Sequence, residues 1–248
     1  MVCNGGPSHD RWACYVPQIS TYVILSQAQG TLGKRNCAVM ILPYIEESIV
    51  ETVKILRRDG VIAYPTDTLY GLGGNPLSPK AVTRIFAIKG RDASKGLPLL
   101  LANVEDLRKV ARALPDLAGV LAQAFWPGPL TLIVKKTRVI PDTVTGGADT
   151  VAVRLPAHPV PRALALDLGF PIIGTSANIS GGPDPVSAED VRRELGPRVD
   201  AIIDGGPTAR GVASTIVDVS GGKPRIARLG ALSADDIEKV CGIAVERP

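Results

Sequence analysis

The segment 64–73 brings together hydroxyls, a carboxylate and glycines that could surround a polar ligand. It follows a short apolar run and places Thr66, Asp67 and Thr68 ahead of flexible glycines. A loop of this kind at the carboxyl end of a buried strand is where open α/β sheets bind ligands. The alternative is a polar turn whose hydroxyls satisfy their own backbone.

A second segment, residues 89–95, carries three cations directly after an apolar helical stretch. Lys89, Arg91 and Lys95 lie within these seven residues. They could clamp a triphosphate, because arginine supplies a planar fork and lysine a movable point charge. The alternative is that cations near a helix C-terminus only complement the helix dipole.

Two further polar segments accompany apolar strands. In residues 126–135 a Pro-Gly-Pro turn leads into a strand on which Thr131 and Lys135 share one face by the period of two. In residues 174–178 small residues let a ligand approach the backbone, and Ser176 and Asn178 offer a hydroxyl and an amide. An edge strand with one solvated face explains the first pattern equally well, and a capped turn explains the second.

Hydrophobic periodicity predicts the elements that must position these segments. Helix N-terminal signals stand at Ser78 before Pro79, at Ser187, and at Ser233 with Asp236. The predicted strands are 61–64, 97–101, 130–134, 151–153, 171–174, 201–203 and 215–219, and the predicted helices are 45–56, 78–88, 104–113, 116–125, 159–168, 187–195 and one after residue 233. Strands and helices alternate without strict order, which predicts a mixed α/β sheet covered by helices in one domain.

The composition excludes several classes of protein. The chain is 45% hydrophobic and 21% charged, and its net charge of +4 suits an anionic ligand or loose RNA contact without establishing either. The sequence has no run of about 18 apolar residues, so it predicts no membrane span. The four cysteines and two histidines lack zinc-site or disulfide-framework spacing, so we expect a reducing, cytoplasmic setting. P-loop and GxGxxG signatures are missing, so phosphate binding must use another device.

Residues 1–39 differ from the rest of the chain. They hold three of the four cysteines and only four charged side chains, and no amphipathic period persists there. We expect a leader that is either a disordered tail or the result of an upstream start assignment, with Met40 as the natural initiator. A targeting peptide is the alternative. The catalytic domain is then expected over residues 40–248.

Taken in order, six motifs resemble the YrdC-like family, and more closely its threonylcarbamoyl-AMP synthases. They are PTDT-YGLG, KGR, WPGPLT, TSAN-SGGP, STIVD and RLG, and the match runs from about residue 46 to residue 240. The KxR and SxN pair in this order is the most specific part. The resemblance implies an α/β fold with a single-domain, twisted, open mixed sheet, flanked by helices, and a deep basic cavity. The chain ends too early for the extra C-terminal domain of the long members, so we expect the short form.

The resemblance also implies an activity and its partners. Synthases of this family are nucleotidyltransferases that condense L-threonine, bicarbonate and ATP to threonylcarbamoyl-AMP and pyrophosphate, the first step of threonylcarbamoyladenosine formation in tRNA. We therefore expect Mg²⁺ to arrive with ATP, with no metal held by the protein itself. A downstream tRNA threonylcarbamoyltransferase complex and weakly bound tRNA or double-stranded RNA are the expected partners. The alternatives are a related carbamoyl-activating enzyme of the same fold and a non-catalytic RNA-binding module.

Roles for individual residues follow from the motifs they occupy. The resemblance implies a catalytic set of Lys89, Arg91, Ser176 and Asn178, in which Lys89 and Arg91 hold phosphates and Asn178 orients the carbamate or a phosphate oxygen. The implied ATP contacts are Arg91, Lys95, Thr131, Ser176, Asp184 and Arg228. The implied L-threonine contacts are Thr68, Lys135, the backbone of Gly174, and Ser214, and Thr66 and Tyr70 shape the pocket.

Three positions depart from the family pattern. Asp92 stands where a proline usually follows the arginine of KxR, so that loop is expected to be looser. Leu100 stands where some members have a histidine that contacts threonine, which leaves only packing at this position. Asp184 replaces a frequent serine, and a carboxylate beside phosphates is unfavourable unless Mg²⁺ or Arg228 offsets its charge.

Overall fold

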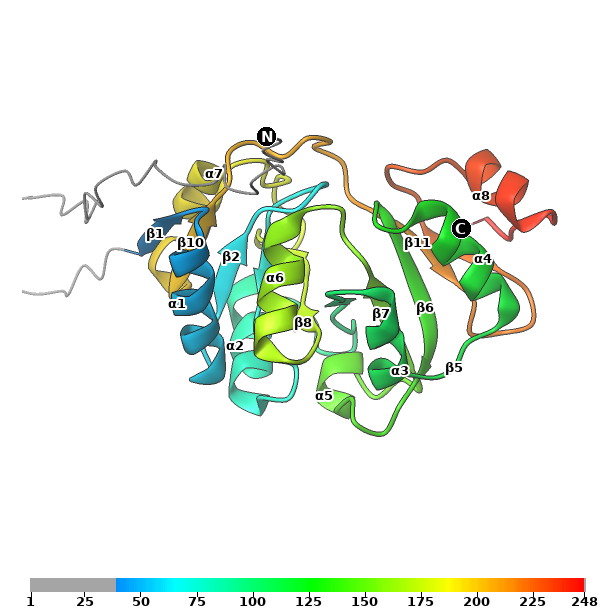
Figure 1. Cartoon of the computed structure of the whole chain (residues 1–248), viewed down its shortest axis with the longest axis horizontal. Coiled ribbons are helices and arrows are strands. Elements are labelled where there is room, and N and C mark those ends of the chain that lie inside the picture. Colours follow the sequence, from blue (N-terminus) through cyan, green and yellow to red (C-terminus); the bar gives the residue numbers. More distant parts are fainter. Residues whose placement is uncertain (1–38, 248) are drawn as a thin grey trace, which may run out of the picture. The chain divides into compact units, whose positions relative to one another are not determined.

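The computed structural model describes residues 39–247, whose strands form two sheets with flanking helices (Figure 1). Apart from Val39, the expected leader at residues 1–39 lies outside the described residues. The predicted mixed α/β fold is confirmed. The prediction of a single sheet is wrong, because the strands divide between two sheets.

The first sheet joins segments from both halves of the chain. Its order is β1 (Met40–Pro43), β10 (Ala201–Asp204), β2 (Ile62–Tyr64), β3 (Gly71–Gly73) and β9 (Thr175–Ser176). The strands β1, β10 and β2 run parallel, and β3 and β9 continue the sheet antiparallel. We expected Gly71–Gly73 to be a loop. It is a strand because its two glycines let the Tyr64 ring lie where a Cβ would stand.

The second sheet supplies the opposite side of the site. Its order is β12 (Arg225–Arg228), β11 (Thr215–Asp218), β6 (Leu130–Lys136), β7 (Thr150–Arg154), β4 (Leu99–Leu100) and β8 (Ile172–Ile173), and β5 (Ala111–Ala113) pairs with β6. The predicted helix 104–113 is therefore partly wrong. Only α3 (Leu107–Val110) is α-helical, after the 3₁₀ turn η1 (Val104–Asp106), because the backbone of Ala111 pairs with Lys136 instead of continuing a helix.

Two connections carry the chain from one sheet to the other next to the site. Between β8 and β9 the crossing is a single residue, Gly174, at which a Cβ would overlap the Leu100 side chain. Between β10 and β11 the crossing is the segment 205–214, the orange loop along the top of Figure 1. Both crossings hold residues that the sequence assigns to the site.

Helices cover the sheets, and three of them begin at the predicted caps. They are α1 (Glu46–Arg57), α2 (Pro79–Lys89), α4 (Asp116–Phe125), α5 (Asp142–Thr145), α6 (Pro159–Leu168), α7 (Ala188–Glu194) and α8 (Ala234–Cys241), with a second 3₁₀ turn η2 (Gly196–Arg198). The Ser78 side chain accepts a hydrogen bond from the Ala81 amide, and Ser187 and Ser233 form capping boxes. These three predictions are confirmed.

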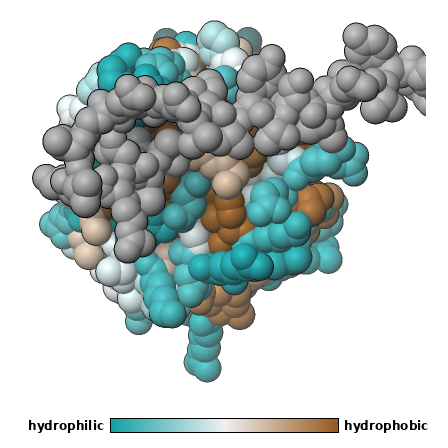
Figure 2. Space-filling model, turned by 90° about the vertical axis from the view of Figure 1, so that its left-hand side faces the viewer, coloured by the Kyte–Doolittle hydropathy of each residue, from teal (hydrophilic) through white to brown (hydrophobic). Residues whose placement is uncertain are grey.

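The core consists of two apolar clusters. The smaller one joins α1 and α6 to the first sheet through residues such as Leu56, Ile62 and Leu164. The larger one joins α2, α4 and the second sheet. Figure 2 shows the face at the β1 and α1 end, where hydrophobic side chains lie between hydrophilic ones; Met40 and Val50 are among the exposed apolar residues of these elements. No helix in residues 39–247 is long and apolar enough to cross a membrane.

Candidate active site

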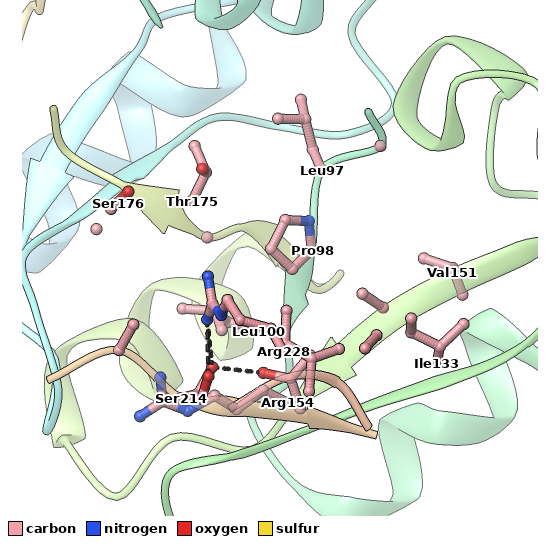
Figure 3. A pocket seen from close by; sticks show the side chains of 18 of the residues that line it. Leu97, Pro98, Leu100, Ile133, Val151, Arg154, Thr175, Ser176, Ser214 and Arg228 are labelled. Carbon is pink, nitrogen blue, oxygen red and sulfur yellow. Dashed lines mark hydrogen bonds between the residues drawn. The ribbon is translucent and has the colours of Figure 1, made fainter. Parts of the chain in front are cut away.

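A cavity of about 390 Å³ is lined by both sheets. The first sheet contributes the segment from Thr66 to Gly71 and the end of β9, and the second contributes β4, β6, β7 and β12 (Figure 3). Ten of the sequence-predicted site residues line this cavity: Thr66, Thr68, Tyr70, Arg91, Thr131, Gly174, Ser176, Asp184, Ser214 and Arg228. Lys89, Lys95, Lys135 and Asn178 are not among its lining residues.

One side of the cavity is built from a chain of hydrogen bonds across the second sheet. The Arg228 guanidinium donates to the Ser214 carbonyl oxygen at 2.7 Å, and the Ser214 Oγ lies 2.8 Å from the Thr131 Oγ1 (Figure 3). Burial lowers the pKa of Arg228, the Asp184 carboxylate raises it, and Arg91 lowers it further. Two arginines and one carboxylate therefore influence one another at this side, which leaves an excess of positive charge.

Arg91 is oriented by its own loop. Its Nε donates to the Lys95 carbonyl at 3.0 Å and its Nη2 to the Gly96 carbonyl at 3.1 Å. Burial lowers the pKa of this guanidinium. The Lys95 side chain is exposed, and the contribution of this residue to the cavity is the carbonyl that holds Arg91.

Lys89 and Asn178 form a buried network behind the cavity wall. The Lys89 Nζ donates to the Ser176 carbonyl at 2.6 Å, the Asn178 carbonyl at 2.8 Å and the Asn178 Oδ1 at 3.1 Å. Asn178 Oδ1 also accepts from the Ser176 Oγ, and its Nδ2 donates to the carbonyls of Gly182 and Pro183. The KxR lysine and the SxN asparagine thus bond to the chain, and they fix the loops that carry Ser176 and Asp184.

The Lys89 network predicts a specific pH dependence of stability. Burial and the charge of Arg91 lower the pKa of Lys89 to about 8, and Glu194 opposes this shift. The pKa of a lysine in the unfolded chain is about 10.4. Between these values the unfolded chain binds the proton more tightly, so the free energy of unfolding should rise with pH through this window. Urea unfolding at several pH values should show this rise in the parent protein and a smaller rise in Lys89→Met. Equal slopes in the two proteins would contradict the assignment.

Arg154 is a site residue that the sequence reasoning missed. Its side chain is 7% exposed at the end of β7, and it lines the cavity. The guanidinium donates from Nε to the Gly128 carbonyl at 2.9 Å, from Nη1 to the Thr68 Oγ1 at 2.8 Å and from Nη2 to the Asp67 Oδ1 at 2.6 Å. Burial lowers its pKa, and Asp67 opposes this. Three of its five N–H groups therefore donate to the chain itself, and the other two remain for a ligand.

The missed signal is an arginine at the end of an apolar strand. In Val151-Ala152-Val153-Arg154 a charged side chain follows three apolar residues of a strand that the pattern predicts to be buried. A buried charge needs a partner. That partner is Asp67, whose Oδ1 also accepts from the Ala157 amide. By the period of two, Thr150 and Ala152 share a face of β7 with Arg154, and both line the cavity.

Lys135 lies beyond the cavity although Thr131 lies in it. Thr131 and Ile133 line the cavity, whereas Lys135 is two residues further along β6, with its Nζ 3.5 Å from the Asp149 Oδ2. Its cross-strand neighbour Thr150 is a lining residue. The period-two argument placed the face correctly, but the cavity ends before Lys135.

Thr66, Tyr70 and Gly174 line the cavity, but several of their polar groups bond to the chain and not to the cavity. The Thr66 Oγ1 donates to the Leu69 carbonyl and accepts from the Thr68 amide, which is the polar turn considered as the alternative. The Tyr70 hydroxyl is directed to residues 205 and 206. The Gly174 amide donates to the Pro98 carbonyl, and Leu100 packs against this glycine, as expected for a packing role.

The remaining wall is apolar. Leu97, Pro98, Ile133 and Val151 lie along it, as Figure 3 shows. Within residues 39–247 no three side chains of histidine, cysteine, aspartate or glutamate gather closely enough to cage a metal ion. Asp184 is the one acidic residue among those that line the cavity in this described part.

Comparisons with known proteins agree with the motifs. The Sua5_yciO_yrdC family, described as "Telomere recombination", matches residues 54–230. The chain is 46% identical over 187 residues to a threonylcarbamoyl-AMP synthase of Pyrococcus abyssi, covering 75% of this chain and 55% of that relative. It is 39% identical over 198 residues to the Bacillus subtilis synthase, covering 79% and 57%, and 42% identical over 168 residues to that of Thiobacillus denitrificans, covering 68% and 89%. The chain thus spans little more than half the length of the first two relatives.

Solved structures share the fold. The crystal structure of P. abyssi Sua5 complexed with L-threonine is 42% identical with a TM-score of 0.80, and the match covers 84% of this chain and 62% of that one. The structure of Escherichia coli YciO is 26% identical with a TM-score of 0.72, covering 80% and 98%. The family match spans most of the chain, and several relatives exceed 30% identity over more than two thirds of it. The chain therefore belongs to the Sua5/YciO/YrdC family.

Proposed function

We propose that this cavity condenses L-threonine, bicarbonate and ATP to threonylcarbamoyl-AMP and pyrophosphate. The observation that carries the proposal is the placement of two separate cationic groups in one cavity. Arg154 bonds to Thr68, whereas Arg228 feels the charges of Arg91 and Asp184, and all five residues line the cavity. One group suits a carboxylate and the other suits a chain of phosphates.

The proposed chemistry needs positioning more than covalent catalysis. The threonine amine attacks the carbon of bicarbonate, and loss of water gives an N-carboxylate. One oxygen of this carbamate then bonds to the α-phosphorus of ATP while the bond to the bridging oxygen of the β-phosphate breaks, so pyrophosphate leaves. Holding both reactants in line and stabilising the phosphate charge accounts for most of the rate in such reactions.

At the amino-acid side, Arg154 is proposed to hold the threonine carboxylate. Its two free N–H groups match a planar anion, and the buried Asp67 keeps the guanidinium in one orientation. Thr68 and Ser214 lie at the same cavity and supply hydroxyls. The role implied for Lys135 passes to Arg154, because Lys135 does not line the cavity.

At the nucleotide side, Arg91 and Arg228 are proposed to hold phosphate oxygens. Ser176 and Thr131 line the same cavity and can contact the nucleotide. Lys89 and Asn178 act through Ser176 and Asp184, so they are positioning residues. Mg²⁺ would reach the site on the phosphates of ATP and neutralise their charge, and Asp184 lines the same cavity.

The partners follow from the product. Threonylcarbamoyl-AMP is a reactive mixed anhydride, so a transferase must consume it, and the proposed acceptor is adenosine in tRNA. We place this reaction in the cytoplasm. Direct RNA binding by this chain would show as an affinity that falls steeply with salt.

Pyrophosphate release with ATP, Mg²⁺ and bicarbonate tests the proposed function. Release should require L-threonine, and serine should support less of it. ATP binding without release would favour a related carbamoyl-activating enzyme, and salt-sensitive RNA binding without ATP binding would favour an RNA-binding module.

Arg91→Ala tests the role of Arg91 in phosphate binding without destabilising the fold. This change should lower pyrophosphate release by about 10²–10³-fold, as expected for loss of a group that stabilises transition-state charge. The melting temperature should change little, because Arg91 bonds only to carbonyls of its own loop. Lys95→Ala should have a far smaller effect. If Lys95→Ala lost as much pyrophosphate release as Arg91→Ala, Lys95 would belong to the phosphate site. Full activity in Arg91→Ala would contradict a role of Arg91 in binding phosphate.

A further inference from the structure

Tyr70 touches three of the loops that line the cavity. Its backbone amide donates to the Pro185 carbonyl at 2.8 Å, and its own carbonyl accepts from the Ala177 amide at 2.8 Å. Its hydroxyl donates to the Gly206 carbonyl at 2.8 Å and accepts from the Gly205 amide at 3.2 Å. The ring is fully buried. The backbone of Tyr70 therefore holds two loops, and its hydroxyl holds a third.

The third loop is the segment 205–213, which we call the strap. It leaves the first sheet after β10 and enters the second sheet at β11 (Figure 1). Two bonds hold its ends, from the Gly206 amide to the Asp204 Oδ1 at 2.9 Å and from the Ala231 amide to the Ala213 carbonyl at 2.9 Å. Between them it is bonded at the Tyr70 hydroxyl, by the Thr208 amide to the Val186 carbonyl at 2.8 Å, and by the Gly211 amide to the Thr68 carbonyl at 3.1 Å. Gly206 and Gly211 have positive φ, so the strap keeps a conformation that other residues rarely adopt.

The strap reaches the proposed amino-acid side of the cavity through Thr68. Gly211 binds the Thr68 carbonyl, and the Thr68 hydroxyl accepts from the Arg154 guanidinium. The charge of Arg210, next to Gly211, is close enough to contribute to the lowered pKa of Arg154. A displaced strap would therefore disturb Thr68 and Arg154. Ser214, the residue after the strap, is held by Thr131 and Arg228.

We propose that the Tyr70 hydroxyl is a positioning group that fixes the strap, which ends at the cavity-lining Ala213, and thereby orders the amino-acid subsite. This inference rests on the proposed function for its link to threonine, but the hold of the hydroxyl on the strap can be tested without it. Gly205 is exposed and Gly206 partly exposed. Water can therefore satisfy their backbone groups when the hydroxyl is removed, and Tyr70→Phe should fold.

The chain offers a matched control in Tyr64. This tyrosine is also fully buried, and its hydroxyl donates to a backbone carbonyl, that of Ile173, at 2.6 Å. Tyr64 does not line the cavity or contact the strap by this bond. Tyr64→Phe therefore removes one buried tyrosine hydroxyl without touching the strap.

Limited proteolysis measures directly how firmly the strap is held. Arg210 is exposed in the strap and is a trypsin site, and the exposed Arg138 outside the strap serves as an internal reference. Tyr70→Phe should be cleaved after Arg210 several-fold faster than the parent protein, relative to cleavage after Arg138. Tyr64→Phe should show a lower melting temperature with unchanged relative cleavage. Unchanged cleavage after Arg210 in Tyr70→Phe would overturn the proposal.

The second arm measures substrate dependence. In Tyr70→Phe the KM for threonine should rise by about tenfold, the effect expected when hydrogen bonds that order a site are lost. The KM for ATP and kcat should stay within about twofold, because Arg91 is held by its own loop and Ser214 is held by Thr131 and Arg228. Equal rises in both KM values, or no rise for threonine despite faster cleavage, would overturn the positioning role. If the parent protein releases no pyrophosphate with threonine, the proposed function fails, whereas the cleavage result still decides whether the hydroxyl holds the strap.

Discussion

Replacing Arg154 by methionine should remove threonine-dependent pyrophosphate release and destabilise the fold together. The change deletes the guanidinium proposed to bind the carboxylate and leaves Asp67, 11% exposed, without its charge partner. Breaking a buried ion pair on one side costs about 3–5 kcal/mol of unfolding free energy. The kcat/KM for threonine should fall by about 10²-fold or more. Urea unfolding and a pyrophosphate assay measure the two effects.

The double variant Asp67→Asn with Arg154→Met separates them. Asparagine removes the uncompensated charge and keeps an oxygen for the Ala157 amide. Stability should therefore recover in large part, because a neutral pair avoids the burial of a lone charge. Activity should stay as low as in Arg154→Met. Recovery of threonine-dependent release along with stability would show that Arg154 only supports the fold.

Lys89→Met should be the second severe variant. It removes the ammonium donor from the carbonyl oxygens of Ser176 and Asn178, and from the Asn178 Oδ1, which keeps its bond from the Ser176 Oγ. Each buried group left without a partner costs about 1–3 kcal/mol. The loop that carries Ser176 should loosen, and pyrophosphate release should fall by about 10²-fold. Lys80→Met, on the same helix with an 85% exposed side chain, is the control and should behave as the parent protein.

A double-mutant cycle with Asn178→Ala tests whether Lys89 acts through the asparagine. If both residues serve one network, the double variant should lose little more activity than either single variant. Independent roles, such as a direct bond from the ammonium to a phosphate, would make the losses in activation free energy add. Additivity would therefore return Lys89 to the role that the motif alone implied.

Local patterns in the sequence were enough to predict most of the helices and three of their caps. Ser78, Ser187 and Ser233 are bonded as their spacing indicates, because an N-cap depends only on neighbours in the chain. The division into two sheets could not be predicted in this way. It depends on the crossing at Gly174, and the need for glycine there comes from Leu100, which is distant in sequence.

The candidate site shows the same limit. Motif spacing located ten lining residues, but it could not tell which cations face the cavity. Lys89 reads as a solvated helix-end cation until the loop 176–178 folds over it. Arg154 reads as the end of an apolar strand until Asp67, 87 residues away in the chain, neutralises it. In both cases the partner that decides the role comes from tertiary packing.

The function we propose for this cavity is to join threonine, bicarbonate and ATP into one adenylate. The most direct measurement is mass spectrometry of the product formed from ATP, Mg²⁺, L-threonine and bicarbonate labelled with a heavy carbon isotope. We expect an adenylate whose mass includes threonine and one labelled carbon, and we expect Arg91→Ala to form none. An adenylate without the label, or no adenylate despite bound ATP and threonine, would contradict it.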